Sequence, residues 1–284
     1  MNQAGSTNAP VLRRSFLTTV ICGSLGGQVS DAVPAGAAVE FFNASLDVLD
    51  DVEDQDAEDA LWRKYGQAVA INAATALLML AQLALTGQGR ATGHSRVIRG
   101  MEALAWSGAR ACSGQHRDLA YEEVPAISET KYFDMTAMKS ASLVDCACRL
   151  GAISADVVDP MVDTFGEFGE HLGVSLQVSN DVESLGESGT AKSDIVRRKK
   201  TLPVIFALAH AVPPEREWLR ELYGARSCVD PIDERRVLEI LRSSGAIHYS
   251  LVQVELHRGK ALSLLKKAHI PDAIIGEIRS ALSF

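Results

Sequence analysis

The stretch "SLDVLDDVEDQD", residues 45–56, decides how the rest of the chain is interpreted, because it places six carboxylates within ten positions. Like charges four residues apart destabilise a helix by roughly 0.2–0.5 kcal/mol per pair. Negative charge at the C-terminal end of a helix also opposes the helix dipole. The run is therefore either a fully solvated acidic face or a site for a divalent cation.

Composition narrows the class of protein. The 284 residues are 47% hydrophobic and 23% charged, with a formal net charge of -8. These values are ordinary for a globular protein with a substantial core. The negative charge, with no basic stripe, argues against nucleic acid as a partner. We expect a cytoplasmic protein.

Hydrophobic periodicity predicts an all-α protein, because Ala, Leu and Met recur at helical spacing and period-2 runs are missing. We expect one helical domain covering residues 1–284. The helices are predicted at 10–28, 34–54, 64–86, 94–113, 129–150, 155–187, 199–211, 232–243, 246–268 and 271–282. Breaks are expected where Gly and Pro gather, at 86–93, 186–193, 212–215 and 269–272.

Two apolar segments resemble targeting or membrane sequences. "LRRSFLTTVICGSLGG", residues 12–27, has the twin arginine of an export signal, but its apolar stretch is short and interrupted, so we expect a helix. Residues 67–85 carry no charge, yet Gln67 and Asn72 interrupt them and no second such segment follows. This favours a buried core helix over a membrane span.

Two helix faces carry oxygen ligands. Asp50 and Asp54 are four residues apart, so both carboxylates project to one side of a helix. Mg²⁺ is usually held by one or two carboxylates together with substrate phosphates. Far downstream, Asn180, Ser184 and Glu187 also share one helix face and offer amide, hydroxyl and carboxylate oxygens.

A basic segment follows the second face. "DIVRRKKTLP", residues 194–203, places Arg197, Arg198, Lys199 and Lys200 in a row. Alone, an acid run or a basic run is usually a solvated surface. Two oxygen-rich faces and a basic segment in one chain, however, are what binding a diphosphate through Mg²⁺ requires.

In this order the segments resemble the trans-polyprenyl diphosphate synthases, a family with the all-helical isoprenoid synthase fold. "DDVED" (50–54) resembles the first aspartate-rich motif, and "LGVSLQVSNDVESL" (172–185) stands at the second. The other matching segments are "KYGQAVAINAATALLMLA" (64–81), "SGQHRDL" (113–119), "YFDMTAMKSASLVDCACRLGA" (132–152) and "RRKKTLPVIFAL" (197–208).

The resemblance implies a Mg²⁺-dependent enzyme that removes diphosphate from an allylic prenyl diphosphate and captures the carbocation. The implied metal ligands and their supporting neighbours are Asp50, Asp51, Asp54, Asn180, Asp181, Ser184 and Glu187. The implied residues at the diphosphate and the reacting end are Lys139, Gln177, Lys199 and Lys200. The implied residues elsewhere around the substrates are Arg13 or Arg14, Arg198, Phe41 and Phe42. Phe41 and Phe42 would limit the tail to roughly C15–C20. We also expect a homodimer.

The chain departs from the family at the site for isopentenyl diphosphate. "NAPVLRRSF", residues 8–16, lacks the Lys of the family's Gly-Lys-Arg motif, and residues 55–64 have no room for its paired Arg. Trp62 stands where the family has His, and the second motif is NDVES rather than DDxxD. We therefore expect an acceptor other than isopentenyl diphosphate, such as a peptide or a small aromatic molecule.

Three interpretations remain open. "DVLDDVEDQD", Trp62 and "KKTLP" look most like the ComQ-type branch, whose members prenylate a tryptophan side chain in a peptide. Asn180, Ser184 and Glu187 approximate the metal triad of terpene cyclases, although Glu187 comes one position early and the chain is only 6% aromatic. The third interpretation is an inactive subunit of a heteromeric synthase. Transfer to an acceptor is the leading hypothesis.

Overall fold

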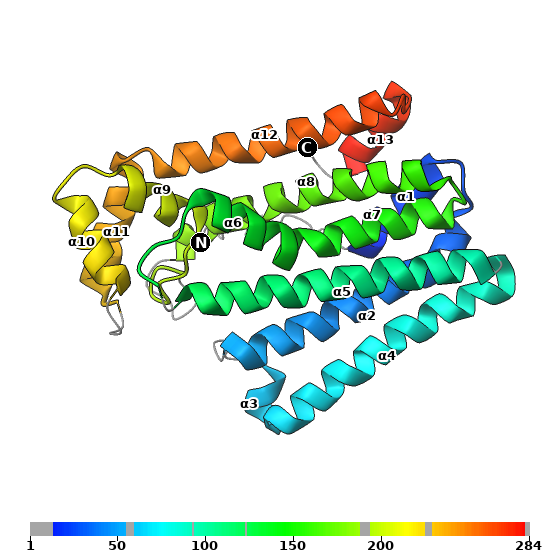
Figure 1. Ribbon diagram of the computed structural model, residues 1–284, viewed down its shortest axis with the longest axis horizontal. Helices are drawn as coiled ribbons and strands as arrows, with labels where there is room; N and C mark the ends of the chain where they lie inside the picture. The colour runs from blue at the N-terminus through cyan, green and yellow to red at the C-terminus, as the bar shows by residue number, and fades with distance from the viewer. Residues whose placement is uncertain are drawn as a thin grey trace, which may run out of the picture.

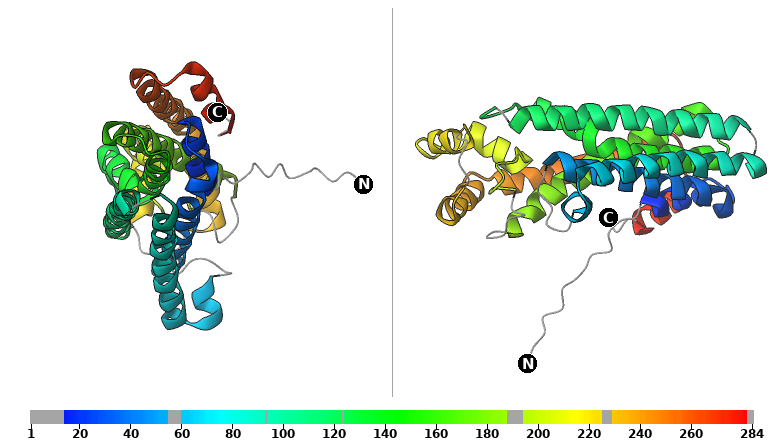
Figure 2. Two further views of the ribbon diagram at one scale, coloured as in Figure 1. Left: turned by 90° about the vertical axis from the view of Figure 1, so that its right-hand side faces the viewer. Right: turned by 90° about the horizontal axis from the view of Figure 1, so that it is seen from below.

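Helices make up every regular element of the computed structural model, which describes residues 14–54, 60–92, 94–122, 124–187, 194–224 and 229–281 (Figure 1). Within these ranges there is no strand. The predicted all-α class is confirmed. Two perpendicular views show the long helices running side by side along the longest axis of the molecule (Figure 2).

The acid-rich sequence forms the C-terminal end of α2 (Val29–Asp54). The helix begins five residues before the predicted start, and Pro34 lies inside it. Small residues let neighbouring helices approach closely: a Cβ on Gly36 would lie 3.3 Å from Cβ of Ser15 in α1 (Arg14–Ser24). α1 buries Leu17 and Ile21 completely, so this segment belongs to the core of the fold.

The centre of the bundle consists of α5 (His94–Glu122), α7 (Ser142–Ser154) and α8 (Asp159–Glu183). A Cβ on Gly169 of α8 would lie 2.7 Å from the carbonyl oxygen of Val144, so only glycine permits this approach of α7 and α8. The predicted helix 129–150 is divided into α6 (Glu129–Thr136), a π-helical turn η1 (Ala137–Ala141) and α7. The predicted helix 155–187 starts only at Asp159 and ends in a 3₁₀ turn, η2 (Ser184–Glu187).

The C-terminal third is formed by α9 (Leu202–His210), α10 (Glu215–Gly224), α11 (Pro231–Ser243), α12 (Ala246–Lys267) and α13 (Asp272–Ala281). α12 runs beside α8 (Figure 1). α10 was not predicted, because it is short and buries only Leu219 and Tyr223. The buried clusters are connected through α8 and α9, which contribute side chains to more than one of them.

The apolar segment 67–85 is not a buried core helix in this chain, and that prediction is wrong. It belongs to α4 (Gln67–Thr92), at the outer edge of the bundle beside α2 and the short α3 (Leu61–Tyr65) (Figure 1). Only 22% of its most apolar window, within residues 67–87, is buried, and by length and composition it is the one candidate membrane span among the described residues. The predicted break at 86–93 is also wrong, because α4 continues to Thr92 through two glycines.

Candidate active site

A cavity of about 490 Å³ lies where the C-terminal ends of α2, α5 and α8 meet η1 and the segment 194–201. Six carboxylates line it, contributed by Asp47, Asp50, Glu53, Asp118, Asp181 and Asp194. The lining cations are Arg14, Lys139, Lys199 and Lys200. Apolar side chains including Leu46, Leu49, Ala111 and Leu143 complete the wall. The cavity thus joins a charged region to an apolar one.

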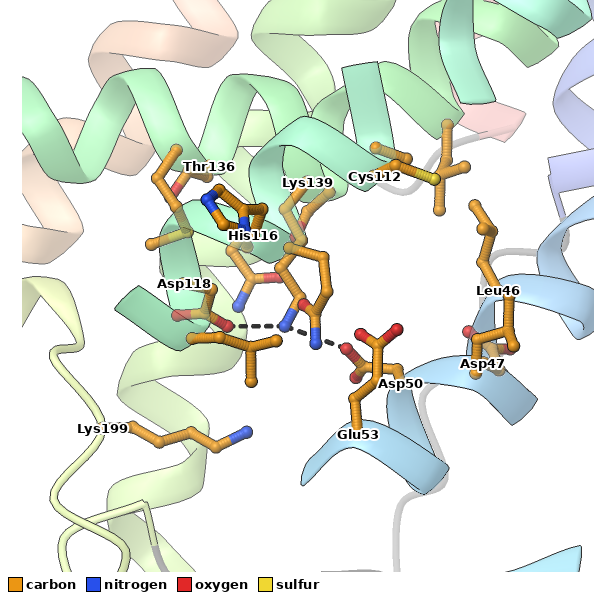
Figure 3. Close-up of a pocket in the computed structure, with 18 of the residues that line it drawn as sticks. Leu46, Asp47, Asp50, Glu53, Cys112, His116, Asp118, Thr136, Lys139 and Lys199 are labelled. Carbon is orange, nitrogen blue, oxygen red and sulfur yellow. Dashed lines mark hydrogen bonds and ion pairs between the residues drawn. The ribbon is translucent and has the colours of Figure 1, made fainter. Parts of the chain in front are cut away.

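The two aspartates at the end of α2 each contact a lysine from a distant segment. Lys139 Nζ lies 3.0 Å from Oδ1 of Asp50 and 2.6 Å from Oδ2 of Asp118 in α5 (Figure 3). Lys199 Nζ lies 2.9 Å from Oδ2 of Asp54. Gln115 Nε2 donates to the other oxygen of Asp54, at 3.3 Å. The structure therefore brings together two predicted metal ligands and two predicted diphosphate-binding lysines.

The position of Lys139 depends on the π-helical turn and on a glycine that faces it. A Cβ on Gly114 of α5 would lie 2.2 Å from the backbone nitrogen of Lys139 and 2.6 Å from its Cα. No side chain fits in that space, so α5 touches the backbone of η1 directly. π-helical turns are rare and frequently occur at functional sites. Here the turn directs the lysine between Asp50 and Asp118.

The charges in this cluster shift one another's pKa values. Burial is the largest single influence on Lys139 and lowers its pKa, but Asp118 and Asp50 together outweigh it and the pKa is raised. Burial at Lys199 is outweighed in the same way, mainly by Asp54, so its pKa is also raised. Burial raises the pKa of Asp50. At Asp54 burial is outweighed by Lys199, and the pKa is lowered.

The corresponding end of α8 is organised differently. Asp181 is 4% exposed, and its Oδ2 accepts hydrogen bonds from Tyr132 Oη at 2.7 Å and the backbone nitrogen of Leu202 at 2.9 Å. Its Oδ1 accepts from Gln177 Nε2 at 2.9 Å. These three donors favour the ionised form, but burial dominates and raises the pKa of Asp181 to about 6. The carboxylate joins α8 to α6 and to the start of α9.

The other predicted ligands of the second motif do not form a cluster with Asp181. Ser184 Oγ donates to the carbonyl oxygen of Asp181 at 3.1 Å and so caps the end of α8. Asn180 is exposed and is not among the residues lining the cavity. Glu187 belongs to η2, but its side chain lies outside the part of the structure that is described.

The basic segment contributes its two lysines but not Arg198 to the cavity. Lys200 is 8% exposed, and its Nζ donates to the carbonyl oxygen of Glu122 at 3.1 Å. Arg198 has a φ of 56° in the tight turn before these lysines, and it is not among the lining residues. Thr201 then precedes α9.

The remaining predicted substrate residues occupy different places. Gln177 lines the cavity beside Asp181. Phe42 is 3% exposed, and its ring fills the space over Gly108, where a Cβ would lie 3.4 Å away. Phe41 packs on the same core, and neither phenylalanine is a lining residue. The expectation that they line the chain pocket is therefore not met in this structure. Arg13 lies outside the described residues.

Asp47, Asp118 and Gln115 are site residues that the sequence reasoning did not single out. Asp118 and Gln115 lie within "SGQHRDL", one helical turn apart on α5, and both reach the α2 cluster. Their i, i+3 spacing is the sequence signal that could have identified them. Asp47 is three residues before Asp50, and the same spacing places it on the cavity side of α2.

The oxygen atoms of Asp50 and Asp54 suit Mg²⁺, but the protein alone provides no complete cage. Among the described residues, no three histidine, cysteine, aspartate or glutamate side chains converge to hold a metal. Mg²⁺ sites commonly have one or two carboxylates, with water and substrate phosphates as the other ligands. The donor set therefore fits a metal that binds together with a phosphorylated substrate.

Comparisons with known proteins identify the family of this chain. The model of the family described as polyprenyl synthetase matches residues 12–241. A geranylgeranyl diphosphate synthase of Mycobacterium tuberculosis is 33% identical over 83% of this chain and 69% of its own length. A geranylfarnesyl diphosphate synthase of Aeropyrum pernix is 27% identical over 95% of this chain and 87% of its own.

Solved structures share the fold. The crystal structure of a polyprenyl synthetase from Streptomyces coelicolor A3(2) superposes with a TM-score of 0.85 at 25% identity, covering 94% of this chain and 82% of that one. A geranylgeranyl pyrophosphate synthase superposes with the same TM-score at 22% identity, covering 95% and 85% of the two chains.

Proposed function

Since the chain belongs to the polyprenyl synthetase family of prenyltransferases, we propose that it ionises an allylic prenyl diphosphate and transfers the prenyl group to an acceptor other than isopentenyl diphosphate. The observation that carries this proposal is the pairing of Asp50 with Lys139 at the wall of the cavity and of Asp54 with Lys199 one helical turn further along α2. Two carboxylates for Mg²⁺ and two ammonium groups for phosphate oxygens meet the charge requirements of a single diphosphate.

In the proposed reaction the C1–O bond of the allylic substrate breaks, and its electron pair stays on the diphosphate. The new bond forms between C1 and a nucleophilic carbon or nitrogen of the acceptor, which loses a proton to a diphosphate oxygen. Mg²⁺ bound by Asp50 and Asp54 would supply the charge that stabilises the leaving group. The ammonium group of Lys139 would leave Asp50 and bind the phosphate oxygens, while it keeps its ion pair with Asp118.

The apolar part of the cavity suits the prenyl tail. Leu46, Leu49, Ala111 and Leu143 line it, and Phe42, one helical turn before Leu46 on α2, packs against Gly108 of α5 without lining the cavity itself. We propose that Phe42 limits the chain to C15 or C20. A Phe42→Ala variant would then use a longer allylic diphosphate than the wild-type protein does, as measured by comparing kcat/KM across substrates of increasing length.

Acceptor-free incubation distinguishes transfer from the main alternative, cyclisation. A ComQ-type transferase given Mg²⁺ and farnesyl or geranylgeranyl diphosphate should release little beyond the prenyl alcohol formed by slow hydrolysis. A terpene cyclase would release a hydrocarbon or a cyclic alcohol under the same conditions. Gas chromatography with mass spectrometry separates these products, and a defined cyclic terpene would contradict the proposed transfer.

We also propose that a second copy of this chain covers the outer face of α4. Leu80 is 43% exposed and Leu83 is 63% exposed, and Trp106 of the adjacent α5 is 73% exposed. A bilayer is a poor alternative, because α4 is held against α2 by buried Ala70 and Ala74 and presents the polar amide of Asn72 on its exposed side.

Sedimentation velocity tests the proposed homodimer. The wild-type chain should sediment with the mass of two copies, and a Leu80→Glu, Leu83→Glu double variant with the mass of one. Val158→Glu is the matched control, because Val158 is 70% exposed at the start of α8 and is not part of α4, so its substitution should leave the dimer intact. A monomeric wild-type protein, or a dimeric double variant, would contradict the proposal.

A further inference from the structure

The cavity has two regions with different charge patterns. Lys139 and Lys199 lie at one end with Asp118, whereas Leu46 and Asp47 lie towards the other end (Figure 3). The proposed allylic diphosphate and its metal use the first region. With the prenyl tail along Leu46 and Leu49, a second substrate that approaches the reacting carbon from this end meets the side chain of Asp47.

That wall contains one arginine, Arg14, whose charge is opposed by nearby carboxylates, although its buried Nε has no hydrogen-bond partner. Arg14 donates through a terminal nitrogen to Oδ1 of Asn43, and Nδ2 of Asn43 donates to Oδ2 of Asp47 at 2.8 Å. The amide of Asn43 thus bridges the two charges. Glu40 does not line the cavity but adds a second negative charge near Arg14, and its Oε1 accepts from the backbone nitrogen of Ser15 at 2.9 Å. An anionic ligand would meet no surplus positive charge here.

The Asp47 carboxylate, in contrast, would gain from a donor. Ionised carboxylates accept hydrogen bonds and cannot donate them. Burial raises the pKa of Asp47, with Asp50 and Asp51 adding to the effect and Arg14 opposing it. A ligand that brings an N–H or ammonium group to this carboxylate forms a charge-assisted hydrogen bond, which is about twice as strong as a neutral one.

We propose that Asp47 determines the charge of the acceptor: it excludes a second diphosphate from the wall at Arg14 and holds an uncharged or cationic acceptor through an N–H or ammonium group. This inference rests on the proposed function, because it concerns the second substrate of the same cavity. It identifies the acceptor by its chemistry, as a nitrogen-containing molecule without negative charge near the reacting atom.

Two ligands with the same carbon chain and opposite charge test the proposal. Isopentenyl diphosphate and isopentenylamine would be titrated separately into protein saturated with Mg²⁺ and an allylic thiolodiphosphate that does not ionise. Calorimetry at pH 7.5 measures the two dissociation constants. The wild-type protein should bind the amine more tightly than the diphosphate.

Asp47→Asn should shift the two affinities in opposite directions. Isopentenyl diphosphate should bind at least about tenfold more tightly, equivalent to ~1.4 kcal/mol, because a like charge has been removed. Isopentenylamine should bind about fivefold more weakly, because an opposite charge has been removed. Asp31→Asn is the matched control, since it removes a carboxylate of the same helix that neither lines the cavity nor acts on Arg14. Both dissociation constants should stay within about twofold in this control.

If Asp47 only stabilises the structure around the cavity, Asp47→Asn should weaken the binding of both ligands. That result would overturn the proposal. Unchanged affinities in Asp47→Asn, or a wild-type preference for the diphosphate, would also overturn it. Turnover is measured separately with an ordinary allylic diphosphate. If Asp47→Asn shifts the two affinities in opposite directions but the wild-type protein releases no diphosphate, the proposed function is contradicted and the role of Asp47 is not.

Discussion

The C-terminal ends of α2 and α8 both bring a carboxylate to the cavity, but the partners of those carboxylates differ. Asp50 and Asp54 contact lysine ammonium groups, which a divalent cation can replace. Asp181 is buried and accepts three hydrogen bonds from groups fixed in α6, α8 and α9. We therefore expect α2 to provide charge that a metal ion or a substrate can exchange, whereas the hydrogen bonds of Asp181 connect α8 to α6 and α9.

The largest effect is expected from removing a carboxylate of α2. Asp54→Ala and Asp50→Ala should each lower the rate of Mg²⁺-dependent diphosphate release at least about 100-fold, because a metal contributes several kcal/mol of charge stabilisation. Circular dichroism would verify that the variants are folded. Glu40→Gln, on the same helix but outside the cavity, is the control. Near-normal release from both alanine variants would show that α2 does not hold the metal.

Asp181→Ala should mainly reduce stability. Tyr132 Oη and the backbone nitrogen of Leu202 would lose their acceptor in a buried position, which costs roughly 1–3 kcal/mol per group. We expect the free energy of unfolding to fall by about 2–4 kcal/mol in urea titrations. Ser184→Ala removes only the hydrogen bond to the carbonyl of Asp181 and should cost less than about 1 kcal/mol. Equal losses in the two variants would contradict the special role of Asp181.

Gly114→Ala should displace Lys139, whose ammonium group contacts Asp50 at the end of α2. The added methyl group would clash with the backbone of Lys139 and force α5 and η1 apart, at a cost of about 1–3 kcal/mol. We expect KM for the allylic diphosphate to rise about tenfold in steady-state kinetics. Gly259→Ala in α12 is the matched control, since a Cβ there meets nothing within 4 Å. Unchanged kinetics in Gly114→Ala would show that the position of Lys139 does not depend on the contact between α5 and η1.

The smallest expected effect is a difference in how the stability contributions of Asp181 in α8 and Asp54 in α2 depend on pH. The pKa of Asp181 is raised to about 6, so its contribution to stability is fully present below the ordinary value of 3.8 and is lost as the pH rises through 6. The pKa of Asp54 is lowered, so its contribution is present above 3.8 and is lost only in stronger acid.

Urea titrations between pH 4.5 and pH 7.5 measure this difference. The gap in unfolding free energy between wild type and Asp181→Asn should narrow as the pH rises. The gap between wild type and Asp54→Asn should stay constant over the same range. A constant gap for Asp181→Asn would mean that the buried carboxylate is ionised throughout, with its three hydrogen-bond donors outweighing burial.

Local patterns predicted most of the helices and the common direction of Asp50 and Asp54 at the end of α2. The i, i+4 spacing of Asp50 and Asp54 fixes their common direction on any helix, and the resemblance of "YFDMTAMKS" to the family identified Lys139. The π-helical turn has no comparable signal, because it depends on the contact between η1 and Gly114. The hydrogen bonds of Asp181 could not be predicted from the sequence either, because Tyr132 and Leu202 are distant in sequence and contact Asp181 only in the folded chain.

The exposure of α4 shows a further limit of sequence patterns. An uncharged apolar run predicts burial, but it does not say whether the covering surface belongs to the same chain. Here α2 covers one side of the helix, and Val69 and Leu83 remain exposed on the other. The positions of Phe42 and Asp47 relative to the cavity likewise depend on how α5 and α1 pack on α2.

Product analysis with and without isopentenyl diphosphate tests the central claim most directly. Purified protein would be incubated with Mg²⁺ and farnesyl or geranylgeranyl diphosphate, and in parallel with isopentenyl diphosphate added. We predict Mg²⁺-dependent release of diphosphate that isopentenyl diphosphate does not accelerate, and no longer prenyl diphosphate. Efficient formation of a chain one isoprene unit longer would contradict the account, because it would require a second diphosphate to bind at the wall formed by Arg14 and Asp47.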